Sequence, residues 1–306
     1  FFSSRRRHTR YISVTGVQTC ALPILRRTIN GVQKRYVERM QTRQISTLEN
    51  CFFVDSGATY NGTNTTATTV TVTGGTTWEP SESLTITASS AIFTGTGDIN
   101  DAIVLTATDG TKYRLRITGY TSTTQVTARV DKTLAAAFRG VATTSWAFAR
   151  NTISGLSWLE GKAVSILADG AVIHGQTVIS GTVTLPRACV IVTVGLPYDS
   201  DLQTLPLALN IEGFGQGRYK NVNKAWLRVY QSSGIFIGPD ADNLTEAKQR
   251  TTEPYGSPPS LKSAEILVML TPSWADSGQV YVRQSDPLPL SIVGRSEEHT
   301  SELQSH

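Results

Sequence analysis

The sequence has few cysteines, few histidines and no long apolar run, and each shortage excludes a class of protein. Two of its three cysteines, Cys51 and Cys189, lie far apart and lack the spacing of metal ligands. Neither a disulfide framework nor a zinc site is therefore expected, and we predict that both side chains are buried as small apolar residues. No segment is apolar over the length that a bilayer-spanning helix needs, so no membrane partner is expected.

Histidine is scarcer still, because His174 is the only one between residues 25 and 294. Catalysis of the Ser-His-acid type needs an imidazole beside the nucleophile, and no GxSxG sequence accompanies this one. We predict that His174, in AVIHGQ, is a surface residue at a strand end before a turn. The sequence predicts no catalytic residue, no cofactor and no metal ligand set, and hence a protein that is not an enzyme.

The two ends of the chain differ from the rest. VTGVQTCALPI at residues 14–24 and RSEEHTSELQS at residues 295–305 have the form of translations of opposite strands of one DNA, which resembles a sequencing-library adapter. SSRRRHTR at residues 3–10 resembles the translated primer that precedes such an adapter. We predict that residues 1–24 and 295–306 are adapter-derived and non-native. The alternative for residues 1–24 is a targeting peptide, with an arginine cluster before the short ALPI run.

Charge is nearly balanced once these ends are set aside. The chain has 28 basic and 24 acidic residues, of which the ends hold five arginines and three glutamates, so 23 and 21 remain. A net charge near +2 does not give the clustered Lys and Arg of a surface that wraps nucleic acid. Local contact with DNA stays open.

Polarity alternates with a period of two along most of residues 25–294, which is typical of strands with one buried face. In LRRTINGVQKRYVERM at residues 25–40, Asn-Gly at positions 30 and 31 favours a hairpin with a type I′ turn. An amphipathic helix that uses Val32, Val37 and Met40 is the alternative. We assign residues 25–62 to the main β domain.

A block rich in Thr, Ser, Gly and Val, with almost no charge, occupies residues 63–150. We predict that it is an inserted small β-barrel or sandwich, with a disordered linker as the alternative. Tight turns are expected at Gly74 with Gly75, at Asp109 with Gly110, and at Gly119. The strictly alternating segments are 69–74, 83–88, 102–107, 113–120 and 124–130, and the bulky side chains are Trp78, Trp146 and Phe148.

Residues 151–294 continue the main β domain. The segment 189–196 is apolar on both faces, whereas 225–231 alternates, and Leu244 to Arg250 is long enough for one or two helical turns. The chain is therefore predicted to be all-β with about 15 strands, as a multi-stranded β-sandwich or propeller-like fold that carries the inserted barrel. Further strands are predicted at 162–173 around an Asp-Gly turn, at 182–185, at 234–239 and at 265–272.

Five phrases, in order, cover nearly all of residues 25–294 and together resemble one family. They are RYVERM at 35–40, FFVDSGATYNG at 52–62, ISGLSWLEGKAVSILADG at 153–170, VGLPYDSDLQTLPL at 194–207 and VRQSDPLPLSIVG at 282–294. Their order and spacing are similar to the C-terminal half of the tail nozzle, tail tubular or stabilisation proteins of short-tailed bacteriophages. The block at 63–150 resembles the β domain often inserted there, which is named FCCH-like after the first catalytic-cysteine half-domain of ubiquitin-activating enzyme.

The resemblance implies a virion structural protein and not ubiquitin chemistry, because the inserted block contains no cysteine. It implies a homo-oligomeric ring, typically a hexamer, that closes the distal tail tube and leaves a channel for DNA ejection. The implied partners are other copies of the chain, other tail proteins and DNA in transit. The implied location is the phage tail, assembled in the cytoplasm of the bacterial host.

Acidic residues offer the remaining chemical candidates. A glycosidase needs two carboxyls across a sugar, and the candidates are Asp199 with Asp201, Asp240 with Asp242, and Glu160. We predict that both Asp pairs lie in turns and cap their own backbone. Asp240, Asp242 and Asn243 also begin like a calcium loop, but the Gly and Glu that such a loop needs later are missing.

Glycine-rich and aromatic segments complete the candidates. EGFGQGRYK, with Gly213, Gly215 and Gly217, lacks the features of a phosphate loop and is predicted to be a loop whose Phe214, Arg218 and Tyr219 face a channel or subunit contact. Trp158, Trp226 and Trp274 are either interface anchors or core residues. The Asn-X-Thr triplets at Asn61, Asn64 and Asn243 are read as incidental. The competing functions are a carbohydrate-binding or adhesin module and a tail-associated polysaccharide hydrolase.

Overall fold

In the computed structural model almost all of the regular secondary structure is β-strand. The structure describes residues 24–29, 31–39, 41, 45, 47–206, 220–248, 250, 253, 257–271, 274–275 and 278–301. Within this part of the chain the helical elements are four 3-10 turns, and no helix has the length and apolar character needed to cross a membrane. The all-β prediction is confirmed. The 3-10 turns are η1 (Leu48–Asn50), η2 (Thr96–Asp98), η3 (Ala136–Phe138) and η4 (Ser157–Leu159).

The chain forms two compact units, Phe1–Gln44 and Ile45–His306. The described part of the first is a hairpin of β1 (Ile24–Ile29) and β2 (Val32–Val37), in which Ile29 pairs with Val32 next to the turn. Gly31 has a φ of +76°, which an L side chain rarely adopts and which a type I′ turn requires. The hairpin prediction is confirmed and the helix alternative is wrong.

The first sheet of the second unit has the order β11-β10-β13-β3. Its central strand β13 is buried on both faces, as its doubly apolar sequence predicts. Asp169 and Gly170 join β10 to β11 with φ values of +48° and +80°, as expected of an Asp-Gly turn. The strands are β3 (Asp55–Asn61), β10 (Ala163–Ala168), β11 (Ala171–Thr177) and β13 (Ile191–Leu196).

A seven-stranded sheet of order β12-β9-β6-β7-β8-β5-β4 contains the strands of residues 63–150, for which the sequence predicts a small barrel. Its last strand, β4, is bridged through Val70 to Thr143 and through Val72 to Arg139, in the segment that leads into β9. Strand β4 therefore returns to the segment before β9, as in a small barrel, and we call the strands β4 to β9 the barrel. The strands are β4 (Val70–Thr73), β5 (Leu84–Ala88), β6 (Ala102–Thr106), β7 (Lys112–Ser122), β8 (Gln125–Val130), β9 (Trp146–Ile153) and β12 (Val183–Cys189).

The barrel core follows the alternation of the sequence. Leu84, Ile86, Leu115 and Ile117 are fully buried, and threonines occupy the positions between the buried ones in β4 and β5. Trp146 and Phe148 belong to the same core, and Trp78 packs against it. Removal of this apolar surface from water is the main favourable term in folding such a block.

Two of the three predicted tight turns of the barrel are wrong. Gly74 and Gly75 begin a ten-residue loop before β5, and the Glu82 carboxylate closes that loop by accepting the backbone N–H groups of Thr76, Thr77 and Trp78. Gly119 lies inside β7, at a register shift, where a Cβ would come within 2.6 Å of Thr127 Oγ1. Gly75 and Gly119 make room for the close side chains of Trp78 and Thr127.

The C-terminal region contributes two smaller sheets around one core. β14-β20-β16-β17 is one sheet, and β15 joins β18 and β19 on one side and β21 on the other. The alternative of one or two helical turns at 244–250 is not found among the described residues, because β17 occupies two of these positions and residues 247, 248 and 250 are irregular; Gln249 lies outside the described residues. The strands are β14 (Ser200–Gln203), β15 (Lys220–Val229), β16 (Phe236–Gly238), β17 (Thr245–Glu246), β18 (Glu265–Met269), β19 (Trp274–Ala275), β20 (Tyr281–Gln284) and β21 (Ile292–Ser301).

The structure has 21 strands among its described residues, where the sequence predicts about 15. Several of the additional strands are very short, such as β17 and β19 with two residues each. Strand β21 continues past residue 294, the predicted end of the native segment, and pairs with β15 up to residue 301. Ladder hydrogen bonds join backbone groups, so pairing of this kind is compatible with many side-chain sequences.

Both predicted buried cysteines are buried, which confirms that interpretation. Burial raises the pKa of the Cys51 and Cys189 thiols to about 11, from an ordinary value of 9.0. Because the thiolate is the reactive form, we expect both to react with iodoacetamide at least about a hundredfold more slowly in the folded chain than in urea. Mass spectrometry of the two peptides would measure this, and equal labelling rates would contradict it.

Candidate functional site

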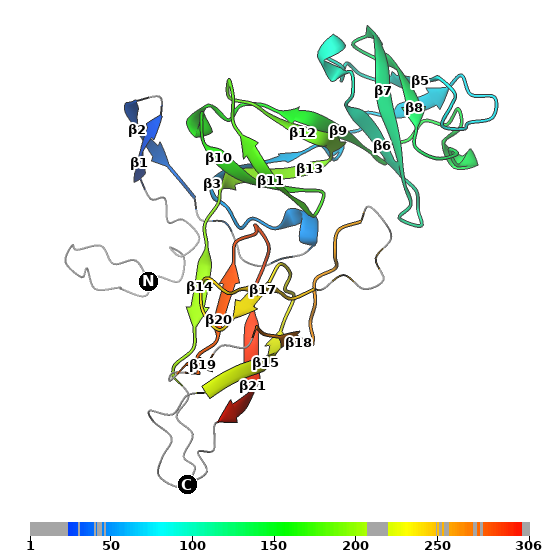
Figure 1. The fold of residues 1–306 in the computed structure, drawn as a ribbon. Helices are drawn as coiled ribbons and strands as arrows, with labels where there is room; N and C mark the ends of the chain where they lie inside the picture. The colour runs from blue at the N-terminus through cyan, green and yellow to red at the C-terminus, as the bar shows by residue number, and fades with distance from the viewer. Residues whose placement is uncertain are drawn as a thin grey trace, which may run out of the picture. The chain divides into compact units, whose positions relative to one another are not determined.

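The barrel is tied to the neighbouring sheet where the chain enters and leaves it. Gly62 follows β3, and its carbonyl accepts the N–H of Phe148 in β9 at 2.7 Å, while its own N–H donates to Val190 at 2.9 Å. Strand β9 pairs with β6 of the barrel through Trp146 to Ala149 and with β12 from Arg150 onward. The predicted domain boundary at residue 150 therefore falls inside one continuous strand, which Figure 1 shows between β6 and β12.

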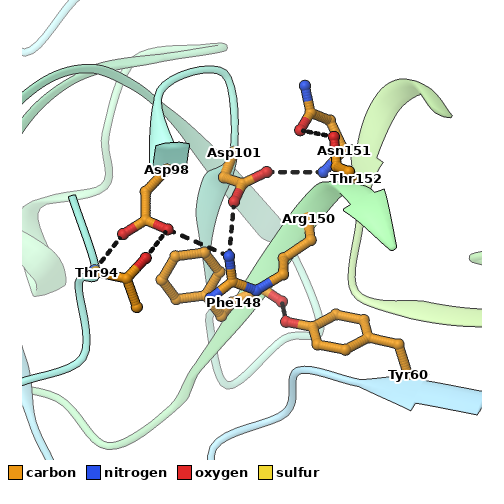
Figure 2. Close-up of polar contacts among 8 residues, drawn as sticks. All are labelled: Tyr60, Thr94, Asp98, Asp101, Phe148, Arg150, Asn151 and Thr152. Atoms are coloured by element: carbon orange, nitrogen blue, oxygen red, sulfur yellow. Dashed lines mark hydrogen bonds and ion pairs between the residues drawn. The ribbon is translucent and has the colours of Figure 1, made fainter. Parts of the chain in front are cut away.

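Arg150 lies where the pairing of β9 changes from β6 to β12, and it binds two buried carboxylates (Figure 2). Its Nη1 lies 3.2 Å from Asp98 Oδ1 and 3.1 Å from Asp101 Oδ2, and the two aspartates are 1% and 2% exposed. Asp98 also accepts the Thr94 N–H at 2.6 Å, and Asp101 accepts the Asn151 N–H at 2.7 Å. We call Arg150, Asp98 and Asp101 the arginine junction.

Aromatic groups complete the junction. The Arg150 guanidinium lies 4.4 Å from the centre of the Phe148 ring, and the Tyr60 hydroxyl of β3 donates to the Phe148 carbonyl at 2.9 Å. Burial raises the pKa of Asp101, against the opposing effects of the Asn151 N–H and Arg150. Every oxygen of the two carboxylates accepts a hydrogen bond, so the arrangement positions strands and presents no free base.

A second arginine makes a comparable contact from strand β7. Arg114 Nη2 lies 3.5 Å from Asp169 Oδ2, and its Nη1 donates to the Ala188 carbonyl. Asp169 in turn accepts the N–H groups of Val190 and Ile191, both at 2.9 Å. Two arginines therefore hold the barrel to the elements around β12 and β13.

The sheet of β15, β18 and β21 has an exposed apolar face. Trp226 pairs in register with Leu267, and we call the face formed by Trp226, Tyr230, Leu267, Met269 and Val293 the outer face. Tyr230, Leu267, Met269 and Val293 are 51–64% exposed, and Trp226 is half-buried. A hollow of about 520 Å³ adjoins the face, lined by Arg228, Val229, Tyr230, Ser263, Ala264, Glu265 and Val293.

One of the two predicted aspartate turns is found and the other is not. Asp240 Oδ1 accepts the N–H groups of Asp242 and Asn243 at 2.9 Å, which confirms the turn there. Asp201 instead lies in strand β14 and forms a two-bonded pair with Arg283 at 2.7 and 3.0 Å, so its assignment to a turn is wrong. The hydrogen bonds from Arg283 lower the pKa of Asp201 to about 2. Asp199 precedes that strand.

The other predicted polar candidates have separate positions. Glu160 accepts the N–H groups of Ser180 and Gly181 at 2.9 and 2.6 Å. His174 is at the surface as predicted, with 70% of its side chain exposed, but it lies within β11 and not at a strand end; its Nε2 lies 3.4 Å from Asp286 Oδ1. Among the described residues no group of three or more His, Cys, Asp or Glu side chains is placed to hold a metal ion.

The aromatic and amide candidates differ in environment. Trp158 packs against the core around β10 and β13 and donates to the Ser56 carbonyl at 2.9 Å, so it is a core residue. Trp274 is 48% exposed. The Asn64 amide donates to three backbone carbonyls, those of Thr66, Thr68 and Thr144. Asn61 accepts the Thr63 N–H, and the Asn243 amide donates to Asp240. The Gly-rich segment with Gly213, Phe214, Gly215, Gly217, Arg218 and Tyr219 lies outside the described residues.

The two arginine contacts have only a weak signal in the sequence. Asp98 and Asp101 stand out as acidic residues in a block that is otherwise rich in Thr and Val, but nothing local indicates that both face Arg150, about fifty residues later. Comparison with family models and with curated proteins finds no match for this chain.

Proposed function

We propose that this chain is a structural component of a virion, the distal tail tube or nozzle protein of a short-tailed phage. The five ordered phrases of the sequence support the family, and the outer face is the structural observation that carries the proposal. A stable protein that leaves several large apolar side chains together in water usually covers them with a partner. The proposed partner is a second copy of this chain, and repetition of the contact forms a ring.

The composition of the outer face suits contact between copies. It combines apolar and aromatic side chains with an exposed arginine, Arg228, and an exposed glutamate, Glu265, which are paired across strands β15 and β18. Aromatic residues and arginine are enriched in protein interfaces. Because both signs of charge lie on one face, an identical copy can place opposite charges against each other.

In this proposal the barrel is an appendage that two arginine contacts hold in place. The ring, typically a hexamer, closes the distal end of the tail and leaves a channel through which DNA passes without a dedicated binding surface, in keeping with the near-neutral composition. Assembly takes place in the host cytoplasm together with other tail proteins. Catalysis has no part in it.

A carbohydrate-binding module is the second candidate, and one observation favours it. Trp226 and Tyr230 are four residues apart in and just after β15 and therefore lie on the same face of the strand, where they could stack on sugar rings. Binding of polysaccharide by the monomer, with no self-association, would support this candidate over the ring. The third candidate, a polysaccharide hydrolase, has less support, because the carboxylates of Asp201, Asp240 and Glu160 already accept hydrogen bonds from other groups of the chain.

The assembly proposal predicts that Leu267→Glu reduces self-association. The substitution places a charge in the centre of the outer face, and a buried unpaired charge costs several kcal/mol in an interface. We expect the association constant, measured by sedimentation velocity over a range of concentrations, to fall by at least about a hundredfold.

The matched control is Leu205→Glu, which makes the same change at a side chain that is 83% exposed and outside the outer face. This variant should associate like the unchanged chain. A chain that stays monomeric at every concentration, or two variants that associate equally well, would rule out the outer face as the assembly surface.

A further inference from the structure

The positive charge of the predicted native segment is concentrated on the hairpin of β1 and β2. Residues 25–39 have one acidic side chain, Glu38, and a net charge of +4. They leave 18 of the 23 basic and 20 of the 21 acidic residues to positions 40–294, whose net charge is therefore −2. Such an uneven distribution of charge points to a polyanionic partner for the basic part. The basic residues of the hairpin segment are Arg26, Arg27, Lys34, Arg35 and Arg39.

One face of the hairpin is exposed along its whole length. Residues directly opposite each other in an antiparallel pair project from the same face, and so do residues two apart along one strand. Three of the six cross-strand pairs therefore share a face, and all six of their members are exposed. On the opposite face Ile29 is buried and Tyr36 is partly buried. We call the exposed one the basic face, and its members are Ile24, Arg26, Thr28, Gln33, Arg35 and Val37.

Two arginines lie directly opposite each other in the middle of the basic face. Ile29 and Val32 flank a two-residue turn and form a hydrogen-bonded pair, so by alternation Arg26 and Arg35 form a non-hydrogen-bonded pair. In such pairs the side chains come closest, with Cα atoms about 4.5 Å apart. The ion pair of the hairpin joins Arg27 to Glu38, and neither Arg26 nor Arg35 makes one with a described residue. Like charges so placed repel each other, and an anion between them relieves the repulsion.

We propose that the basic face binds duplex DNA, with the hairpin in the major groove. This groove, about 12 Å wide, admits a two-stranded β-ribbon. Arg, Gln and Thr side chains, which occupy the four central positions of the basic face, donate to phosphate oxygens and base edges. An acidic protein surface suits this face less well, because protein interfaces have an apolar core. The proposal does not rest on the proposed function, because the charge and geometry of the hairpin carry it.

The number of exposed cations sets the salt dependence of the binding. Arg26, Lys34, Arg35 and Arg39 are exposed, whereas Arg27 is bound to Glu38. Each phosphate that a cation neutralises releases counterions, so contact with about four phosphates gives a slope of about −3.6 for log K against log salt concentration. The affinity should therefore fall by roughly a hundredfold between about 50 and 200 mM salt. Contact is local, because the rest of the predicted native segment is slightly acidic.

The test is fluorescence anisotropy of the full chain with a fluorescein-labelled duplex of mixed sequence, about 20 base pairs long, over a range of salt concentrations. We expect saturable binding at about 50 mM salt with the slope given above. Replacing both Arg26 and Arg35 with glutamine should weaken binding by at least about tenfold and make the slope less steep by about two. Replacing both with lysine keeps the charges and should retain most of the slope.

The barrel offers a matched control, because it also holds two opposed arginines. Arg116 of β7 pairs with Arg129 of β8, and both are exposed. Residues 63–150 have seven basic and six acidic side chains, so this pair lies in a nearly neutral block. Replacing Arg116 and Arg129 with glutamine removes the same number of charges in the same geometry. This variant should bind the duplex like the unchanged chain and with the same slope.

Competitors distinguish duplex DNA from other polyanions. A single strand of the same length, polyglutamate and phosphatidylserine vesicles should each displace the duplex poorly at matched charge, because none of them offers a major groove. The proposal fails if the unchanged chain does not bind the duplex at about 50 mM salt, or if the two glutamine variants lose affinity equally. It also fails if polyglutamate or the vesicles compete as well as unlabelled duplex, which would make the hairpin a general anion-binding surface.

Discussion

Replacing Arg150 with methionine is expected to lower the free energy of unfolding by about 3 kcal/mol. The substitution keeps most of the apolar stem but removes the cation that faces Asp98 and Asp101, which are 1% and 2% exposed. Loss of one partner leaves buried charge without compensation, which typically costs about 3–5 kcal/mol. We use the lower end of that range because the Arg150 side chain is 30% exposed, so water can occupy part of the space that its guanidinium leaves beside the two carboxylates. Urea denaturation followed by tryptophan fluorescence measures the change.

Two further variants separate this effect from a general loss of ion pairs. Arg283→Met breaks a still shorter pair, with Asp201 at the surface. Exposed pairs of this kind contribute little, so the loss of stability should be far smaller. Adding Asp98→Asn and Asp101→Asn to Arg150→Met removes the stranded charges and should restore part of the stability. If Arg150→Met and Arg283→Met lower the free energy of unfolding equally, the arginine junction contributes no more to stability than a surface ion pair.

The Arg150→Met variant should also respond differently to pH. Burial already raises the pKa of Asp101, and loss of the guanidinium removes one of the influences that oppose this. A carboxyl whose pKa is higher in the folded than in the unfolded state binds more protons when folded, so stability falls as the pH rises through that range. The deficit of the variant relative to the unchanged chain should therefore shrink between about pH 7 and pH 5.

Gly62→Ala is expected to lower the free energy of unfolding by about 3 kcal/mol or more. An ideal Cβ at this position would overlap the carbonyl oxygen of Phe148 and would come within 2.7 Å of the Tyr60 hydroxyl. The overlap involves the backbone carbonyl of Phe148, so the chain segments around Gly62 and Phe148 have to move apart. Overpacking in a fixed position costs about 1–3 kcal/mol, and here the lost hydrogen bonds of Gly62 add to it.

Gly97→Ala is the matched control, because a Cβ at Gly97 meets nothing within 4 Å. Its effect should stay within about 0.5 kcal/mol. Thermal melts of both variants by circular dichroism provide the comparison. A Gly62→Ala chain that melts at the temperature of the Gly97→Ala chain would show that position 62 tolerates a side chain beside Phe148.

The sequence predicts the strands well because side-chain polarity in a strand follows from one local rule. Ala225, Leu227 and Val229 alternate with Trp226 and Arg228, and the structure buries the first three, as expected. The Asn-Gly and Asp-Gly pairs also mark their turns, because these residues accept a positive φ. Such signals lie within a few residues of the feature that they predict.

The contacts that determine the arrangement are not local, and the sequence does not reveal them. Arg150 meets Asp101 across 49 positions, and Asp201 meets Arg283 across 82. Nearby Pro and Gly residues favour a turn at Asp201, yet pairing with β20 makes it part of a strand. Gln284 reads as an ordinary polar residue of an alternating segment, and only the structure shows that it is buried, with its amide donating to the carbonyls of Ser233 and Leu288.

Strand β9 has a mechanical consequence. Its first half is bonded to β6 and its second half to β12, with no loop between them. A pull on the barrel along this strand would load many ladder bonds at the same time in shear, whereas a pull through a flexible tether would first straighten the tether. The strand therefore transmits tension directly between β6 and β12, the two strands with which it pairs.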